Sequence, residues 1–300
     1  MIRIYLKKIR YLLEALVTIL GIYFFKFIGP KFGPYISGFI SLRVGSLHST
    51  NKLAIDNLSR AMPELSLKKK KNIIKKMWIN LGRIIGEFIH ISSKETDFVV
   101  KKYVIVDKKN IDNIDFIKNL ALKNNVGGII FSAHIGNWEI GPRTLEYYGL
   151  KVRTLYRPLN NPYIEKITAG MRRSRLIEKS SKGNRQIIEA LKNKEFVIIL
   201  ADQKISEGEP IKFFHEDAIT TTSLARIALR YNASLIPARC VRIDNKFKFR
   251  ILIERPMEFS KTNDLNVDIR DLTRKINIKI EEWIREYPEQ WFWVHNRWKK

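Results

Sequence analysis

Apolar residues recur with different periods in the two parts of this chain. Up to about residue 100 they recur at helical spacing, whereas from about Val104 short apolar runs alternate with amphipathic stretches. The apolar runs at 127–133, 151–158 and 195–203 are typical of buried strands. Because strands that alternate with helices form parallel sheets, the pattern predicts an α/β fold with a mostly parallel central sheet flanked by helices.

Further strands and helices complete this pattern. The strands expected at 234–243 and 246–254 are predicted to form an antiparallel pair. Gly149 and Pro288 are expected to end helices, since glycine adopts the left-handed conformation of a helix end and proline cannot continue a helix. The predicted helices of this region lie at 137–149, 161–176, 183–194, 221–233 and 263–288.

A lysine-rich amphipathic helix is predicted at 65–90, with Ser66 as its N-cap. Its apolar face consists of Ile73, Ile74, Met77, Trp78, Leu81, Ile84, Ile85 and Phe88. The lysines at 68–71, 75 and 76 crowd its first half, where positive charge opposes the helix dipole. These lysines therefore do not serve helix stability, and they face either an anionic surface or solvent alone.

The N-terminal segment combines basic and apolar residues. Its uncharged core, 15–25, reaches the about 20 residues of a bilayer span only if Glu14 and Lys26 are included. We expect a membrane anchor over residues 1–45 that is not cleaved, with its basic end on the cytoplasmic side, and an α/β domain over residues 46–300. An ordinary core helix is the alternative.

The composition adds a strong positive charge. The net charge is +25, from 55 Lys and Arg against 30 Asp and Glu, which indicates a polyanionic partner such as nucleic acid, an anionic membrane or a phosphorylated substrate. Compositional drift is the alternative explanation of the total. The single cysteine, Cys240, excludes an internal disulfide and a Cys-based metal site, and its apolar neighbours indicate a buried thiol.

The stretch FSAHIGNWEIG, residues 131–141, contains a titratable pair. His134 follows a predicted strand, and active sites of open α/β sheets lie beyond the carboxyl ends of the strands. Glu139 is the nearest acid along the chain, and a carboxylate on one imidazole nitrogen leaves the other free to act as a base. The pair is interpreted as a general base with its orienting acid. The alternative is a core histidine that pairs with a helical glutamate.

No protein nucleophile accompanies this pair in the sequence. A Gly-x-Ser-x-Gly elbow, a His-Glu-x-x-His motif and a glycine-rich phosphate loop are absent. The remaining histidines, His48, His90, His215 and His295, do not form a metal-ligand spacing with His134. A base without a nucleophile indicates that the substrate supplies the attacking group, for instance a hydroxyl.

Several distinctive blocks follow one another over nearly the whole chain. They are AMPELS at 61–66, NLGRIIGEF at 80–88, FSAHIGNWEIG at 131–141, YRPLNNPYIE at 156–165, ADQKISEGEPIKFFHEDAITTT at 201–222 and YPEQWFWVHNRWK at 287–299. Together they resemble the bacterial lipid A lauroyl/myristoyl acyltransferases, within the lysophospholipid acyltransferase superfamily, whose His-x4-acid motif matches His134 and Glu139. Lys204 stands where the family has the second acid of an Asp-Gln-Asp segment, so the family's role for that position is not carried over to this chain.

The resemblance implies a reaction. A fatty acyl group would pass from an acyl carrier protein thioester to a hydroxyl of a lipid A precursor, in lipopolysaccharide biosynthesis. His134 would take the hydroxyl proton, Glu139 would orient the imidazole, and N–H groups around Gly136 and Asn137 or a nearby arginine would stabilise the oxyanion. No metal or organic cofactor is implied.

The resemblance also implies substrate-binding residues. Arg157 matches the superfamily's arginine block and suits a substrate phosphate, and Arg185 is a second candidate for binding an anion. Asp202 and Gln203 are included because Asp202 ends a predicted strand on the same edge as His134, where it would hold the loops of the site by hydrogen bonds. The alternatives are surface charges for the two arginines and a turn cap for Asp202.

The expected partners are all anionic: acyl carrier protein, the lipid A precursor and the inner-membrane surface. The expected location is the cytoplasmic face of the bacterial inner membrane. A different glycolipid or lysophospholipid acceptor is the nearest alternative. A nucleic-acid-binding protein is a third possibility, but helix-turn-helix, zinc-finger and RNA-binding aromatic motifs are absent; an inactive membrane interaction protein is a fourth. The aromatic segment WFWVHNRW, 291–298, suits packing against the domain or a membrane interface.

Overall fold

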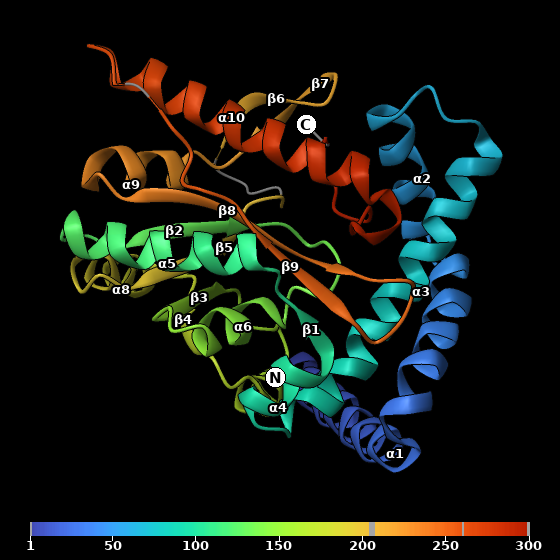
Figure 1. The fold of residues 1–300 in the computed structure, drawn as a ribbon. Helices are drawn as coiled ribbons and strands as arrows, with labels where there is room; N and C mark the ends of the chain where they lie inside the picture. Colours follow the sequence, from blue (N-terminus) through green and yellow to red (C-terminus); the bar gives the residue numbers. More distant parts are fainter. Residues whose placement is uncertain (1, 204–207, 260, 299–300) are drawn as a thin grey trace.

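The computed structural model of this protein, which describes residues 2–203, 208–259 and 261–298, contains a seven-stranded sheet in the order β1-β9-β8-β2-β5-β3-β4 (Figure 1). Neighbouring strands are parallel, except that β8 and β9 are antiparallel. The strands of this sheet are β1 (Val104–Ile105), β2 (Gly128–Ser132), β3 (Val152–Tyr156), β4 (Arg175–Glu178), β5 (Phe196–Leu200), β8 (Ser234–Arg242) and β9 (Phe249–Ile253). The predicted α/β class and the predicted antiparallel pair are therefore confirmed.

Helices surround this sheet, and a separate antiparallel hairpin lies outside it. The hairpin consists of β6 (Glu209–Phe213) and β7 (Glu216–Thr220). The helices are α1 (Ile2–Leu47), α2 (Thr50–Ala61), α3 (Leu67–Ser92), α4 (Thr96–Tyr103), α5 (Lys108–Lys123), α6 (Gly141–Tyr147), α7 (Pro162–Met171), α8 (Ser181–Lys192), α9 (Ser223–Tyr231) and α10 (Leu265–Glu286), followed by the 3₁₀ turn η1 (Pro288–Gln290).

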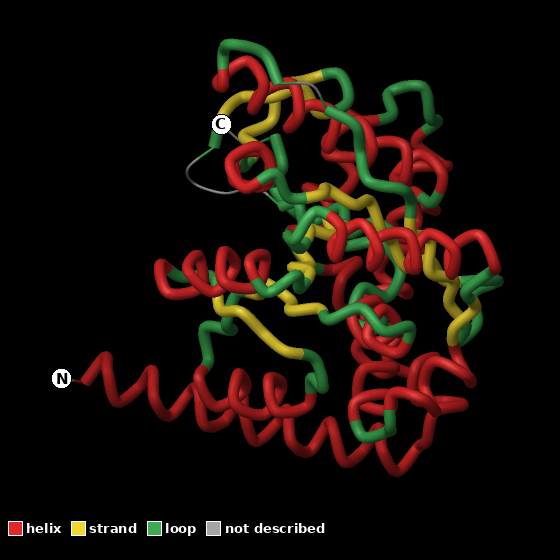
Figure 2. Tube along the Cα trace, turned by 60° about the vertical axis from the view of Figure 1, so that its left-hand side comes forward, coloured by secondary structure: helices red, strands yellow, loops and turns green. Residues whose placement is uncertain are grey.

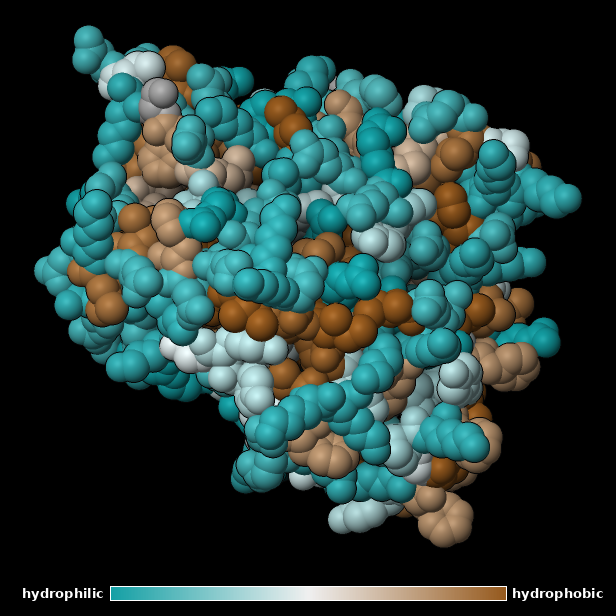
Figure 3. Space-filling model, in the orientation of Figure 1, coloured by the Kyte–Doolittle hydropathy of each residue, from teal (hydrophilic) through white to brown (hydrophobic). Residues whose placement is uncertain are grey.

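The two faces of the sheet belong to two apolar clusters. Successive residues of β2 alternate between them, since side chains along a strand point to opposite faces. Ile129 and Phe131 pack with residues of α8, α9 and α10, whereas Ile130 packs with residues of α5 and α6. On the face that carries α5 and β9, polar side chains frame an apolar band (Figure 3).

Most of the predicted elements are present, with some changes of boundary. The side chain of Ser66 caps α3 by accepting a hydrogen bond of 3.4 Å from the backbone N–H of Lys69. Gly149 follows α6 with a φ of 87°, the left-handed conformation expected of a residue that ends a helix. The helix predicted at 161–176 is wrong at its end, because α7 stops at Met171 and β4 begins at Arg175.

Helix α1 consists of two arms that meet at Gly29, whose φ of 83° and ψ of 169° are not helical. The second arm packs closely on α3. A Cβ atom on Gly82 would collide with the carbonyl oxygen of Ser37, and one on Gly45 would collide with the ring of Trp78. The two helices therefore approach at a distance that only glycine allows at these positions.

The first arm of α1 lies along one side of the molecule, beside α7 (Figure 2). Asn161, the N-cap of α7, donates hydrogen bonds of 2.9 Å to the backbone oxygen of Tyr11 and to the Glu14 carboxylate. Among the described residues, Tyr5–Leu47 is the one stretch that is long and apolar enough to cross a membrane, and 6 % of its most apolar window is buried. The protein thus has the expected N-terminal membrane-associated helical segment, while the division at residues 45 and 46 stays a prediction.

Candidate active site

His134 and Asp202 are brought together by the pairing of two central strands. Ser132 of β2 lies opposite Leu200 of β5 in a parallel register. The backbone N–H of Ala201 donates a hydrogen bond of 2.9 Å to the backbone oxygen of Ser132. His134 and Asp202 each come two residues after these paired strand ends. The carboxyl ends of parallel strands therefore place an imidazole beside a carboxylate, where open α/β sheets hold their active sites.

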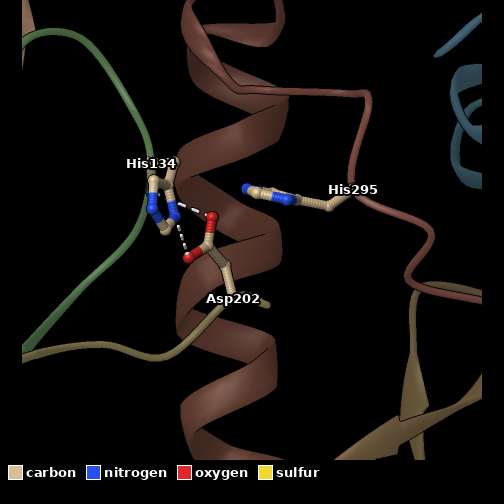
Figure 4. A group of neighbouring side chains, drawn as sticks. All are labelled: His134, Asp202 and His295. Carbon is tan, nitrogen blue, oxygen red and sulfur yellow. Dashed lines mark hydrogen bonds and ion pairs between the residues drawn. The ribbon is translucent and has the colours of Figure 1, made fainter. Parts of the chain in front are cut away.

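Asp202 holds His134 through both of its oxygens (Figure 4). Nδ1 of the imidazole lies 2.8 Å from Oδ1, and the backbone N–H of His134 donates 2.8 Å to Oδ2. The indole N–H of Trp291 also donates 2.8 Å to Oδ2. A carboxylate that accepts from Nδ1–H leaves the lone pair at Nε2, so this arrangement prepares His134 to take a proton there.

The charge of Asp202 is stabilised although the side chain is fully buried. Burial alone would raise the pKa of the Asp202 carboxyl, but the charge and hydrogen bonds of His134 and the nearby His295 hold this pKa well below its usual range. Asp202 is therefore ionised and able to stabilise a positive charge on the imidazole.

The pairing of His134 with Glu139 that the sequence predicted is wrong in this structure. The carboxylate of Glu139 accepts hydrogen bonds of 3.0 and 2.8 Å from Nε and Nη2 of Arg172, just after α7. The reason lies in the backbone: residues 138–140 form a turn, and α6 begins only at Gly141, before Pro142. The turn directs Glu139 toward α7, and the predicted helix that would have folded it back toward the imidazole is not formed at this position.

His295 is a site residue that sequence reasoning did not identify. Its ring centroid lies 4.8 Å from that of His134, and the side chain comes from the segment after η1. Burial, with the charge of His134 next, lowers the pKa of His295 to about 4, so its imidazole is neutral near pH 7. No local spacing links it to His134, because the two residues lie far apart along the chain.

The second nitrogen of His134 faces the side chain of Gln203. Nε2 of Gln203 lies 3.1 Å from Nε2 of His134 and 3.5 Å from Nε2 of His295. An amide N–H at this place caps the lone pair of the proposed base, and a substrate hydroxyl would take over the same position. Gln203 is exposed, so this exchange requires no rearrangement of the core.

A metal ion does not suit this cluster. His134, Asp202 and His295 offer ligand atoms within 4.8 Å of one another. However, Oδ2 of Asp202 already accepts two N–H groups, from the His134 backbone and Trp291, and Oδ1 faces Nδ1. N–H donors thus face both oxygens of the Asp202 carboxylate, and they stabilise its negative charge without a metal ion.

The C-terminal segment closes the site as part of the domain core. Ile135 forms a β-bridge with Trp291. Two backbone hydrogen bonds of 3.1 Å flank this bridge: the N–H of Phe292 donates to the oxygen of His134, and the N–H of Gly136 donates to the oxygen of Gln290. Trp291 and Trp293 are fully buried. These two aromatic residues pack inside the domain, which was one of the two alternatives.

One of the backbone donors predicted for an oxyanion is engaged elsewhere. The Gly136 N–H donates a hydrogen bond of 3.1 Å to the backbone oxygen of Gln290. Cys240 itself is buried, as expected, and burial raises the pKa of its thiol to about 12, which keeps it protonated. The Gly136 N–H is therefore not available for an oxyanion beside His134, whereas the role of the Asn137 N–H stays a prediction.

The remaining candidates are less closely connected. Arg157, which follows β3, and Arg185 in α8 are both exposed, and within the described ranges neither makes a hydrogen bond or ion pair with His134 or Asp202. Their roles in substrate binding stay predictions. Lys204 lies outside the described residues.

Comparisons with known proteins show relatives that match nearly the whole chain. The model of the family "bacterial lipid A biosynthesis acyltransferase" matches residues 2–300. A lipid A biosynthesis palmitoleoyltransferase of Escherichia coli strain K12 is 26% identical over 279 residues, covering 91% of this chain and 84% of the relative. The lauroyltransferase of the same strain is 25% identical over 254 residues (83% and 78%), and its myristoyltransferase is 21% identical over 271 residues (88% and 80%).

These matches confirm the resemblance found in the sequence blocks. They extend over both arms of α1, the sheet and the aromatic C-terminal segment, so they concern the whole architecture and not one motif. Acyl transfer in lipid A biosynthesis is the activity that this match supports. The chain belongs to the bacterial lipid A biosynthesis acyltransferase family.

Proposed function

We propose that this protein transfers a fatty acyl group from an acyl carrier protein thioester to a hydroxyl of a lipid A precursor, with His134 as general base. The observation that carries the proposal is the buried Asp202 carboxylate on Nδ1 of His134, at the carboxyl ends of β2 and β5. The assignment of the acid differs from the one expected from the sequence, because Asp202 replaces Glu139 as the group that orients the imidazole.

The reaction follows from this arrangement. Nε2 of His134 takes the proton of the acceptor hydroxyl while the oxygen attacks the thioester carbonyl carbon. The tetrahedral intermediate then breaks its carbon–sulfur bond, and the imidazolium returns the proton to the departing thiolate. Asp202 stabilises the imidazolium between these two steps. The acyl ester and a free thiol are the products, so the proton balance closes within the site.

Glu139 and Arg172 are proposed to act beside the base and not on it. Their carboxylate–guanidinium pair is bidentate, with side chains 18% and 24% exposed. Such a pair holds a guanidinium in a fixed orientation, which suits the recognition of an anionic group of the acceptor. Arg157 and Arg185 are proposed as additional phosphate contacts.

The membrane location is proposed from α1 and the overall charge. The first arm exposes large apolar side chains, among them Val17 at 68%, Leu20 at 59% and Phe24 at 53%. Together with a net charge of +25, this arm suits the anionic cytoplasmic face of the inner membrane, where the acceptor lipid is present.

The test combines purified protein and cells. Wild type and His134→Ala are assayed for acyl transfer from acyl carrier protein to a lipid A precursor, with His215→Ala, an exposed histidine, as the matched control. We expect His134→Ala to lose roughly a thousandfold in kcat and the control to keep its rate. Equal activity of wild type and His134→Ala would exclude His134 as the base.

A second measurement tests the acceptor. Lipid A from cells with and without this protein is compared by mass spectrometry. A mass difference of one acyl group identifies both the acceptor and the chain length, whereas an unchanged lipid A together with altered phospholipids would assign a different acceptor.

A further inference from the structure

A network of buried polar side chains lies between α3, the end of β8 and the loop that carries His134. Its members are Asn80, Glu87, Asn137 and Arg242, with 7, 0, 0 and 5 % of their surfaces exposed. Asn80 and Glu87 belong to the block NLGRIIGEF, and no residue of this block has a role in the reaction proposed above. Burying an ion pair costs several kcal/mol unless all its groups are hydrogen-bonded. The buried pair of Glu87 and Arg242 next to the site therefore requires an explanation.

The ion pair at the centre of this network is bidentate. Nη1 and Nη2 of Arg242 both bind the Glu87 carboxylate, the second with a distance of 2.9 Å to Oε2. Nε of Arg242 donates 2.8 Å to Oδ1 of Asn80. Burial raises the pKa of Glu87, whereas the charge of Arg242 and the hydrogen bonds from Arg242 and Asn137 act against this shift. The negative charge of the Glu87 carboxylate therefore depends on Arg242 and Asn137.

The network holds the loop after β2 at several points. Nδ2 of Asn137 donates 2.9 Å to Oε2 of Glu87, while Oδ1 of the same side chain accepts 3.2 Å from the N–H of Glu139. Nδ2 of Asn80 donates 3.3 Å to the oxygen of Gly136. Glu87 is thus hydrogen-bonded directly to Asn137, and Arg242 is connected to Gly136 through Asn80.

The loop fits directly against β8 at this place. Gly136 has a φ of 59°, and a Cβ atom on it would collide with the carbonyl oxygen of Cys240. A loop that lies this close to a strand is sensitive to small shifts of the groups beneath it. Because His134 precedes Gly136 by two residues, such a shift moves the imidazole relative to Asp202.

We propose that Glu87 and Arg242 are positioning residues, which fix residues 134–139 so that His134 keeps its place between Asp202 and the substrate. The effect of Glu87 and Arg242 on the rate rests on the proposed function. Their effect on the imidazole of His134 does not, because it can be measured without substrate.

The polarity of the network gives a specific test. Oε2 of Glu87 accepts from both Asn137 and Arg242, so Glu87→Gln places an amide N–H where an acceptor is needed. Adding Asn137→Asp reverses the pairing, because the new amide then donates to a carboxylate and the charge opposite Arg242 is retained. We expect Glu87→Gln to lower kcat by roughly 10- to 100-fold with KM changed by less than about twofold, and the double variant to recover most of the rate.

Glu195→Gln is the matched control. Glu195 is a buried carboxylate at the other end of the sheet, bonded by Arg153 at 2.5 Å and Arg175 at 2.6 Å. The variant Glu195→Gln loses a comparable ion pair far from the loop of His134. The kcat of this variant should therefore stay within about twofold of wild type even where its melting temperature falls. Equal losses of kcat in Glu87→Gln and Glu195→Gln would overturn the positioning role.

A spectroscopic measurement separates this inference from the proposed function. In protein labelled with ¹⁵N-histidine, we expect the Nδ1 and Nε2 signals of His134 to shift in Glu87→Gln and to stay unchanged in Glu195→Gln. Unchanged signals in both variants would overturn the inference even if the enzyme is active. If Glu87→Gln does not fold, Asn80→Ala provides the same two measurements, because it removes the hydrogen bonds of Asn80 to Gly136 and to Nε of Arg242. Failure of His134→Ala to reduce activity would contradict only the proposed function.

Discussion

Trp291 donates its indole N–H to Oδ2 of Asp202 at 2.8 Å, and this oxygen also accepts the backbone N–H of His134. The carboxylate that orients the imidazole is therefore fixed by a residue of the C-terminal segment as well as by the loop it supports. A buried acceptor with two donors at one oxygen keeps a single orientation, which leaves Oδ1 for Nδ1 of His134.

Trp291→Phe is expected to weaken this orientation without removing the aromatic packing. Loss of one hydrogen bond to a buried carboxylate costs roughly 1–3 kcal/mol, so thermal stability should fall and kcat should decrease by about tenfold. Trp293→Phe is the control, because Trp293 donates to the oxygen of Pro288 and not to Asp202. Steady-state kinetics and thermal melts of both variants check the difference, and equal kcat values for them would contradict it.

Asp202→Asn is expected to have a larger effect than Trp291→Phe. An amide at this position either donates to Nδ1, which places the proton of the imidazole on Nε2, or leaves Nδ1 without a carboxylate. We expect kcat to fall by roughly 10³-fold or more, with the protein still folded. Rates at saturating substrate, together with circular dichroism, provide the measurement; a decrease below about tenfold would contradict the orienting role of Asp202.

Glu139→Gln and Arg172→Gln should resemble each other, because each removes one partner of the same ion pair. If Glu139 acts only through Arg172, the double variant should lose no more activity than either single variant. A cycle of kcat/KM values for the three variants tests this. A loss in Glu139→Gln far greater than that in Arg172→Gln would instead support a direct action of Glu139 on His134.

His295 predicts a dependence of stability on pH. Its pKa is about 4 in the folded protein and about 6.5 in an unfolded chain, so between these values the unfolded chain binds more protons. Stability should therefore decrease as the pH falls from about 6.5 to about 4, by up to about 3 kcal/mol from this group. Chemical denaturation at several pH values checks the trend. His295→Gln should flatten this part of the curve, and an equally steep curve in that variant would assign the effect to other groups.

The first arm of α1 predicts membrane binding through its exposed side chains. Replacing Val17, Leu20 and Phe24 together with Asp removes apolar surface and introduces negative charge, so binding to anionic vesicles should fall by at least about tenfold. Flotation with vesicles measures this binding. The matched control replaces three exposed lysines of α3, Lys71, Lys75 and Lys76, with Asp. A greater loss of binding in the control would assign the membrane contact to α3.

Much of this fold could be predicted because the pattern of side chains is strong there. The apolar runs of β2, β5 and β8 are buried on both faces, and α3 has a capping serine and a regular apolar face. By contrast, β4 has four residues of which only Ile177 is buried, so its pattern does not differ from that of a helix end. The hairpin β6–β7 has five residues in each strand, of which only two are buried, and we did not predict it.

The site was partly predictable for a similar reason. The position of His134 after a buried strand follows from the sequence, and Asp202 was identified on the same edge. The orienting bond could not be predicted, because it depends on the register of β2 and β5 and on the turn that directs Glu139 toward Arg172. His295 and Trp291 reach the site only through tertiary packing.

The place of residues 290–297 within this site has a consequence for protein synthesis. Trp291 and His295 are synthesised after the sheet, after the loop of His134 and after Asp202. The bonds of the C-terminal segment to Ile135, His134 and Asp202 can form only after that. A nascent chain therefore lacks a completed site until translation has passed these residues.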